Sequence, residues 1–224
     1  MYHTVHRACT NWYAREVVDM VGSDPEDEAA PGKDGDRRAQ LVNAAVDYVA
    51  AHGIADLSLR GLGAAIGVSH RMLIHYFGSK EHLLVEIVRT SEQRQRDLLS
   101  RLRLEPGLLP VDAARLLWQQ LTAPQLAGQE RLFFEIYGWA LRGRPEAAPF
   151  LEGLVNDWLE PLVAAEVAAG ADPPVARNRA RLGLATVRGL LLDLLATGDR
   201  EGVNAAMEDF LRLYYGEASP ESLP

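Results

Sequence analysis

Apolar residues recur at the spacing of an α-helix through most of this chain, and this periodicity restricts the fold more than any other feature. In the first such segment, Leu41, Val42, Ala45, Val46 and Val49 form one stripe at i, i+1, i+4, i+5 and i+8. The rest of the chain repeats this period and lacks the strict apolar–polar alternation of a half-buried β-strand. The sequence therefore predicts an all-α protein.

Capping residues, glycines and prolines divide the periodic region into separate helices. Asp36 is expected to cap the first helix, which Gly53 ends, and Ser58 and Ser69 are expected to cap two short helices separated by Gly67. Longer helices are expected near residues 79–103, 110–123, 126–143, 145–169, 174–197 and 200–215.

These signals predict four parts along the chain. Residues 1–35 are rich in acids, Gly and Pro toward their end and are expected to form a disordered leader. Residues 36–82 are expected to form a small three-helix domain, residues 83–216 a larger helical bundle, and residues 217–224 a disordered tail.

Charge is unevenly distributed over the 224 residues. The whole chain carries a formal net charge of −8, which excludes a basic field over the whole molecule. Residues 37–80 nevertheless hold five basic side chains against two acidic ones, a net charge of +3. A basic segment inside an acidic protein points to a local role for that segment, although a solvated surface would have the same charge.

Cysteine usage and hydropathy indicate the compartment. The single cysteine, Cys9, cannot form an intrachain disulfide, which fits a reducing environment. The first twenty residues lack the apolar core of a signal peptide. The most apolar stretch, residues 189–196, is short and contains Asp193, so no membrane partner is expected. The sequence predicts a cytoplasmic protein.

The stretch from Ser58 to Lys80 has the form of a helix-turn-helix, with two short helices around Gly67. Helical spacing divides the second helix into two faces. One face is expected to anchor the core through Leu73, Tyr76 and Phe77, and the other is expected to expose His70, Arg71, Ile74 and His75. A cation, two imidazoles and an isoleucine suit a surface that enters the major groove of DNA.

Residues 37–89 resemble the DNA-binding domain of the tetracycline-repressor (TetR/AcrR) family of bacterial transcription regulators. The segments RRAQLVNAAVDYVAAHG and GVSHRMLIHYFGSKEHLL carry the resemblance, with Leu73, Phe77 and Lys80 at compatible spacings. The sequence departs from the family pattern at Arg71, Ile74, His75 and Tyr76, which concerns base preference and not the fold. The expected DNA-binding residues are Arg37, Ser58, Arg60, Ser69, His70, Arg71, Ile74, His75, Tyr76 and Lys80.

Other chemistries have weaker support. His70 and His75 are five residues apart, which does not align them as metal ligands, and His3, His6 and Cys9 supply only three ligand types without a second cluster. The chain lacks a Gly-rich phosphate loop, a zinc-protease helix and a nucleophile elbow, and spacing pairs no carboxylates on an apolar face. No metal, no cofactor and no enzymatic activity are expected.

The resemblance implies that the helices after residue 82 form a chamber for a small apolar or amphipathic effector. Aromatic residues of the second half are candidates for its lining, although any one of them could equally be core: Trp118, Phe134, Tyr137 and Trp158. The last two helices are expected to form a homodimer interface because they are strongly apolar. Its candidate residues are Leu184, Val187, Leu191, Leu195 and Phe210.

Two functions are consistent with these features of the sequence. The first is a dimeric, ligand-responsive transcription regulator, most simply a repressor that leaves a palindromic operator in double-stranded DNA when a small molecule binds. The second is a helical interaction module of the same fold that has lost sequence-specific DNA binding, which the changes at Arg71, Ile74 and His75 would allow.

Overall fold

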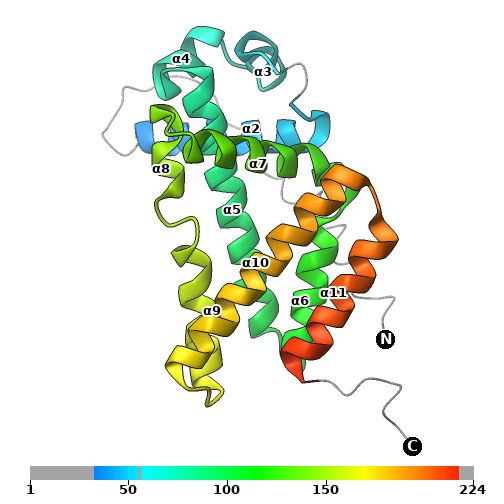
Figure 1. The fold of residues 1–224 in the computed structure, drawn as a ribbon. Helices are drawn as coiled ribbons and strands as arrows, with labels where there is room; N and C mark the ends of the chain where they lie inside the picture. Colours follow the sequence, from blue (N-terminus) through cyan, green and yellow to red (C-terminus); the bar gives the residue numbers. More distant parts are fainter. Residues whose placement is uncertain (1–32, 55–56, 217–224) are drawn as a thin grey trace, which may run out of the picture. The chain divides into compact units, whose positions relative to one another are not determined.

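The computed structural model describes residues 33–54 and 57–216, and every regular element within these ranges is helical (Figure 1). The predicted all-α fold is therefore confirmed. The α-helices are α2 (Lys33–His52), α3 (Leu59–Ala65), α4 (His70–Phe77), α5 (Lys80–Leu104), α6 (Pro110–Leu121), α7 (Ala127–Leu141), α8 (Ala148–Leu151), α9 (Asn156–Ala168), α10 (Pro173–Thr197) and α11 (Arg200–Tyr215). Single 3₁₀ turns, η1 (Pro124–Leu126) and η2 (Pro145–Ala147), precede α7 and α8.

The predicted start of the first helix needs correction. Helix α2 begins at Lys33, so residues 33–35, which were assigned to the leader, are helical, and Asp36 lies in the first turn instead of capping it. An acidic side chain in the first turn is favourable there because the helix dipole is positive at its N-terminus. The remainder of the expected leader, with His3, His6 and Cys9, and the expected tail at 217–224 lie outside the described residues.

The prediction of one helix over residues 145–169 was wrong. The structure has η2 and α8 up to Leu151 and a new helix, α9, from Asn156. Gly153 between them has φ of +78°, a left-handed conformation that glycine adopts without strain. Leu154, in the same break, is buried and belongs to the core, so tertiary packing favours the interruption over a continuous helix.

The caps predicted for the two short helices are confirmed. The side-chain oxygens of Ser58 and Ser69 each accept a backbone hydrogen bond of 3.1 Å, from the N–H groups of Gly61 and Met72. Such caps satisfy one of the free amides at each helix start. Gly67, in the turn between the helices, has φ of +74°.

Residues from Arg37 onward form one compact unit, and all packing described here lies within it. Its main core joins α2, α3 and α4 to the first half of α5, to α7 and to α8. Leu62 on α3, Leu73 on α4, Ile87 on α5 and Ile136 on α7 are all fully buried in it. The helix-turn-helix therefore shares its core with the bundle that follows it.

Two further clusters hold the rest of the bundle together. One joins α6, α10 and α11 through residues such as Trp118, Leu191 and Met207. The other joins α6 and α9 to the second half of α5 and includes Trp158 and Leu121. Helix α5 thus runs from the helix-turn-helix into the bundle, and Figure 1 shows it passing behind α10.

Within the described ranges, no helix is both long enough and apolar enough to cross a membrane.

Candidate nucleic-acid interface

Helices α3 and α4 pack closely through the turn that joins them. A Cβ atom built on Gly63 of α3 would lie 2.7 Å from the carbonyl oxygen of Val68 in the turn, which is closer than the atoms can approach. The residue at this position must be glycine for the backbone of the turn to contact α3 directly. Sequence reasoning missed Gly63, because a glycine inside a helix carries no signal of what lies opposite it.

Helix α4 divides into a buried and an exposed face, as its spacing predicted. Leu73 and Phe77 are buried, and Tyr76 is half-buried against the same core. The predicted groove-facing side chains are all exposed, namely His70, Arg71, Ile74 and His75. A helix anchored on one side with these groups in solvent has the form that a recognition helix needs.

The remaining predicted DNA-contacting residues lie on α2 and at the starts of α3, α4 and α5. Ser58 and Ser69 are exposed caps, and Arg60 is exposed one residue into α3. Lys80 is the first residue of α5, next to the Ser79 cap, and is half-buried. Arg37 is exposed on α2, where its guanidinium donates to Oε1 of Gln40 over 3.3 Å.

Arg38 holds three helices of this region together. Its guanidinium lies 5.1 Å from the ring centre of Phe77 on α4, and its Nη1 is 3.0 Å from Oε2 of Glu86 on α5. A cation over an aromatic face is attracted by the ring electrons. In the sequence, Arg38 contributed only to the charge of the basic segment. In the structure, it links α2 to α4 and α5.

Helix α2 is also tied to α5 and α7 further along. The Nη1 atom of Arg94 on α5 is 2.6 Å from Oδ1 of Asp47, and its Nη2 donates to the side chain of Asn43 over 2.8 Å. Just after the end of α2, Gly53 approaches Gly128 of α7, where an added Cβ would lie 2.9 Å from the Cα of Gly53. Helix α2 is therefore in direct contact with α5, and the residue after its end is in contact with α7.

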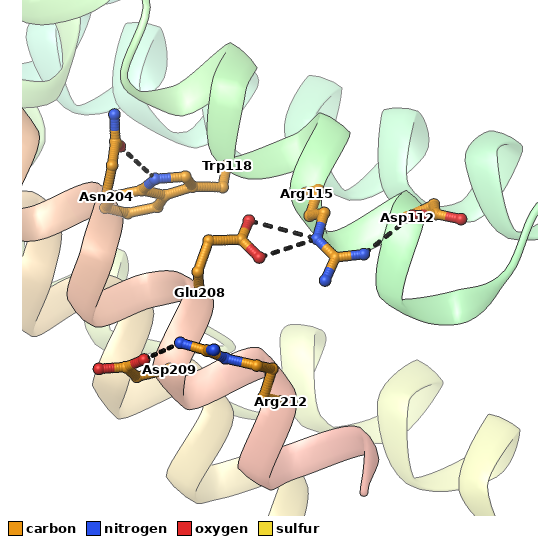
Figure 2. A network of polar contacts seen from close by, with 7 residues as sticks. All are labelled: Asp112, Arg115, Trp118, Asn204, Glu208, Asp209 and Arg212. Atoms are coloured by element: carbon orange, nitrogen blue, oxygen red, sulfur yellow. Dashed lines mark hydrogen bonds and ion pairs between the residues drawn. The ribbon is translucent and has the colours of Figure 1, made fainter. Parts of the chain in front are cut away.

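Of the four aromatic residues predicted for an effector chamber, Trp118 joins α6 to α11. Its indole N–H donates to Oδ1 of Asn204 over 2.8 Å, as Figure 2 shows. Arg115 strengthens the same contact, with Nε 3.0 Å from Oε2 of Glu208 and Nη1 3.0 Å from Oδ1 of Asp112. Trp118 itself is buried and serves the packing of these helices.

The other three predicted aromatic residues lie on α7 and α9. Tyr137 and Phe134 are half-buried, and each packs edge-on against the ring of Phe133. Trp158 is buried, and its indole N–H donates to Oε2 of Glu92 over 2.8 Å. Trp158 is thus the predicted residue that touches a buried ionisable group.

A buried polar cluster lies where α5 meets α7 and α10. Glu92 and Glu130 are both buried, and Nη2 of Arg188 on α10 is 3.4 Å from Oε2 of Glu92. Burial raises the pKa of Glu92, against the opposing effects of Arg188 and of the Trp158 N–H. Burial and the neighbouring charge of Glu92 raise the pKa of Glu130 to about 8. This pair carries no signal in the sequence, because the two carboxyls come from different helices.

The predicted dimer residues divide into two groups. Leu191 is buried and belongs to the core of the chain, whereas Leu184, Val187, Leu195 and Phe210 are half-buried. The large apolar side chains that α10 and α11 expose most are Leu182 (60%), Leu192 (50%) and Leu213 (85%). Exposed residues of α10 at positions 178, 182, 185, 189, 192 and 196 follow one stripe, which consists mostly of leucine and small residues.

Comparison with known proteins bears on the same region. Residues 41–87 match the sequence profile of bacterial regulatory proteins of the tetR family. A stretch of 54 residues is 39% identical to the HTH-type transcriptional regulator BetI of Agrobacterium fabrum, and it covers 24% of this chain and 26% of that protein. The chain thus spans about a quarter of the length of this curated relative.

Solved structures extend the likeness to the rest of the chain. A transcriptional regulator from Rhodococcus sp. Rha1 has a TM-score of 0.62 at 24% identity, over 82% of this chain and 99% of that one. The multidrug binding protein EbrR, complexed with imidazole, has a TM-score of 0.55 at 25% identity, over 85% of this chain and 97% of that one. Residues 41–87 thus match the DNA-binding part of the tetR family of bacterial regulatory proteins, as the resemblance in the sequence implied, and the described helices share the fold of solved transcriptional regulators.

Proposed function

We propose that this protein is a dimeric repressor that binds a palindromic operator through α4 and is released from it by a small molecule held in the helical bundle. The proposal rests on the two faces of α4, of which one is buried and the other exposed. Leu73 and Phe77 fix one face of the helix in the core, while Arg71 and its exposed neighbours remain available to DNA. The match of residues 41–87 to the tetR family of regulatory proteins supports the same function.

The exposed residues have separate roles in this proposal. Arg71, Ile74 and His75 face the major groove, where Arg71 reads guanine through two hydrogen bonds and Ile74 contacts thymine methyl groups. His70 and Tyr76 lie at the edges of this surface. Phosphate contacts come from the residues at helix starts and on α2, which fix the register without reading sequence: Arg37, Ser58, Arg60, Ser69 and Lys80.

Dimerisation would place two copies of α4 on successive turns of one DNA face. The exposed stripe of α10, with Leu182 and Leu192, and Leu213 of α11 supply the apolar surface for a two-fold contact. The half-buried Leu184, Val187, Leu195 and Phe210 would support this surface from behind. Two recognition helices about 34–36 Å apart match half-sites one helical turn apart in a palindrome.

Effector binding would act through α5. This helix begins at Lys80 beside α4 and continues to Leu104 in the bundle, where it meets the residues around Trp158. A ligand changes DNA affinity only if it binds the two arrangements of α5 with different affinity. The similar protein EbrR is a multidrug binding protein that was solved with imidazole, which supports a ligand-responsive role for this chain.

Fluorescence anisotropy with DNA from upstream of the gene tests the proposal. A random duplex is titrated in parallel, at several salt concentrations. We expect a preference of roughly 10³ or more for the operator fragment. Arg71→Ala should weaken binding to the operator by roughly tenfold to a hundredfold, with little change on the random duplex, since one bidentate contact to guanine contributes about 1–3 kcal/mol.

Arg131→Ala is the matched control, because Arg131 is an exposed arginine on α7 and is not among the predicted DNA-contacting residues. It should bind both duplexes as the unmodified protein does. If Arg71→Ala weakens binding to both duplexes equally, Arg71 contacts the phosphates and does not read the bases. Weak binding without any preference, over a wide set of genomic fragments, would instead support the helical interaction module.

A further inference from the structure

Helix α4 is short, and its buried residues lie on one line. It has 8 residues, which is just over two helical turns. Leu73 and Phe77 are its buried residues, and they are four positions apart on the same face. A short helix that is anchored along a single line can still roll about that line. The direction of its exposed face therefore depends on contacts beside the two anchors.

Arg38 on α2 supplies such a contact at the last residue of α4. The central carbon of its guanidinium lies 5.1 Å from the ring centre of Phe77. A cation over the face of an aromatic ring is attracted by the ring electrons, and the planar guanidinium also stacks on the ring. Phe77 thus has a partner on a third helix in addition to its place in the core.

Glu86 on α5 holds the guanidinium in this position. Its Oε2 accepts a hydrogen bond from Nη1 of Arg38 over 3.0 Å, and both side chains are partly buried. Glu86 lies in the second turn of α5, and only Gly78 and Ser79 separate α5 from α4. Arg38 therefore ties the end of α4 to the beginning of α5.

The helix that carries Arg38 is itself fixed to α5. A second ion pair joins the same two helices with the charges exchanged, since Nη1 of Arg94 on α5 is 2.6 Å from Oδ1 of Asp47 on α2. Glu86 and Arg94 lie about two turns apart along α5. Two ion pairs of opposite sense, one at each end of the contact, oppose sliding of α2 along α5. Arg38 thus extends toward α4 from a fixed support.

We infer that Arg38 is a positioning residue for α4, which sets the direction of the groove-facing side chains and does not itself contact DNA. The inference rests on the proposed function, in which α4 reads the operator. The guanidinium of Arg38 is engaged by a ring and a carboxylate, whereas its neighbour Arg37 is exposed. Arg38 precedes residues 41–87, which match the tetR family, so that match assigns it no role.

The position of α4 affects two kinds of DNA binding differently. On the operator, Arg71 and its neighbours must meet particular base edges, so the affinity falls with the fraction of molecules in which α4 points correctly. Binding to random DNA depends on phosphate contacts, which carry no sequence information. The ratio of operator affinity to random-duplex affinity therefore measures the positioning of α4. Loss of a phosphate contact, or of folded protein, changes both affinities together.

Arg38→Lys keeps the charge and tests the geometry. An ammonium group is a compact charge without the planar fork, so it cannot stack on Phe77 and bind Glu86 as the guanidinium does. We expect the affinity ratio to fall by about threefold to tenfold, with the random-duplex affinity and its salt dependence unchanged. Arg89→Lys, at an exposed arginine of α5, is the matched control and should leave the ratio unchanged.

Glu86→Gln gives opposite results for the two roles that Arg38 could have. If Arg38 positions α4, the ratio falls by about threefold or more, and the double variant with Arg38→Lys is no worse than the stronger single variant. If Arg38 contacts phosphate, the released guanidinium strengthens binding to both duplexes and the ratio stays the same, which would overturn the inference. Glu81→Gln removes a carboxyl from the first turn of α5 and is the control for the change in charge.

Amide hydrogen exchange of the free protein separates this inference from the proposed function. Arg38→Lys and Glu86→Gln should speed exchange in α4 by at least about threefold relative to Arg89→Lys, because exchange reports local opening. Faster exchange in α4, without operator preference in any of the proteins, would support the positioning role and contradict the proposed function. Unchanged exchange in α4, or an operator preference that both variants retain in full, would overturn the positioning role and leave the proposed function in place.

Discussion

The indole N–H of Trp158 on α9 donates to the buried carboxylate of Glu92 on α5 over 2.8 Å. Arg188 on α10 approaches the same oxygen, Oε2, at 3.4 Å. Side chains from α9 and α10 thus meet at one atom of α5, the helix that begins beside the DNA-binding region. A buried charge needs such partners, and removing one of them exposes its full desolvation penalty.

Trp158→Phe should therefore destabilise the protein more than Trp118→Phe does. Both indoles are buried and both donate over 2.8 Å, but Trp118 donates to the exposed Asn204, which water can satisfy instead. We expect losses of about 2–4 kcal/mol for Trp158→Phe and about 1 kcal/mol for Trp118→Phe in the free energy of unfolding. Urea denaturation of both variants measures the difference, and equal losses would show that the charge of Glu92 does not matter.

Glu130 should make the stability of the protein depend on pH. Its pKa rises from 4.5 to about 8 on folding, so the folded state holds a proton that the unfolded state has lost between these values. The contribution of Glu130 to stability is thus present below pH 4.5 and is lost as pH rises toward 8, by up to about 1.4 kcal/mol per unit.

Glu130→Gln replaces the titratable carboxyl with a neutral amide. The free energy of unfolding of the variant should therefore depend less on pH than that of the unmodified protein. The variant should gain stability over the unmodified protein as pH rises from 5 to 8, by up to about 4 kcal/mol. Urea denaturation across this pH range measures the gain, with Glu135→Gln, at an exposed carboxyl on the same helix, as the control. Parallel profiles for the three proteins would mean that Glu130 is not protonated in the folded state.

Gly63→Ala should damage the helix-turn-helix. The added Cβ would meet the backbone carbonyl of Val68 at 2.7 Å, and neither α3 nor the turn can move without disturbing Leu62 and Leu73. We expect a loss of about 1–3 kcal/mol in stability and weaker operator binding, as for an overpacked core. Ala64→Ser, at the exposed neighbouring position, should be nearly neutral in thermal denaturation and in anisotropy. An unaffected Gly63→Ala variant would contradict the close packing of the turn.

Leu182→Glu and Leu192→Glu should weaken the proposed dimer. Both leucines are at least half exposed on one stripe of α10, and a carboxylate in an apolar two-fold interface meets its own copy or buries an unpaired charge. We expect the dimer dissociation constant to rise by at least about tenfold in sedimentation velocity. Leu141→Glu, at a leucine that is 70% exposed at the end of α7, is the control. A dimer that persists in both α10 variants would place the interface elsewhere.

Local features of the sequence determined much of the DNA-binding region. The serine caps, the turn at Gly67 and the two faces of α4 depend on neighbours within a few residues, so helical spacing predicted all of them. The same reasoning located most of the later helices. It failed over residues 145–169, where burial of Leu154 against other helices favours a break that no local signal requires.

Only the tertiary structure decided which side chains meet in the bundle. Amphipathic spacing shows that Leu191 and Leu192 lie on an apolar helix. Packing against α6 and α11 buries Leu191, whereas Leu192 remains half exposed. Glu92 and Glu130 are 38 positions apart on different helices, and their interaction arises because α5 and α7 pack with these faces together. Short-range periodicity fixes the helices and their faces, whereas the pairing of faces depends on contacts between residues far apart in sequence.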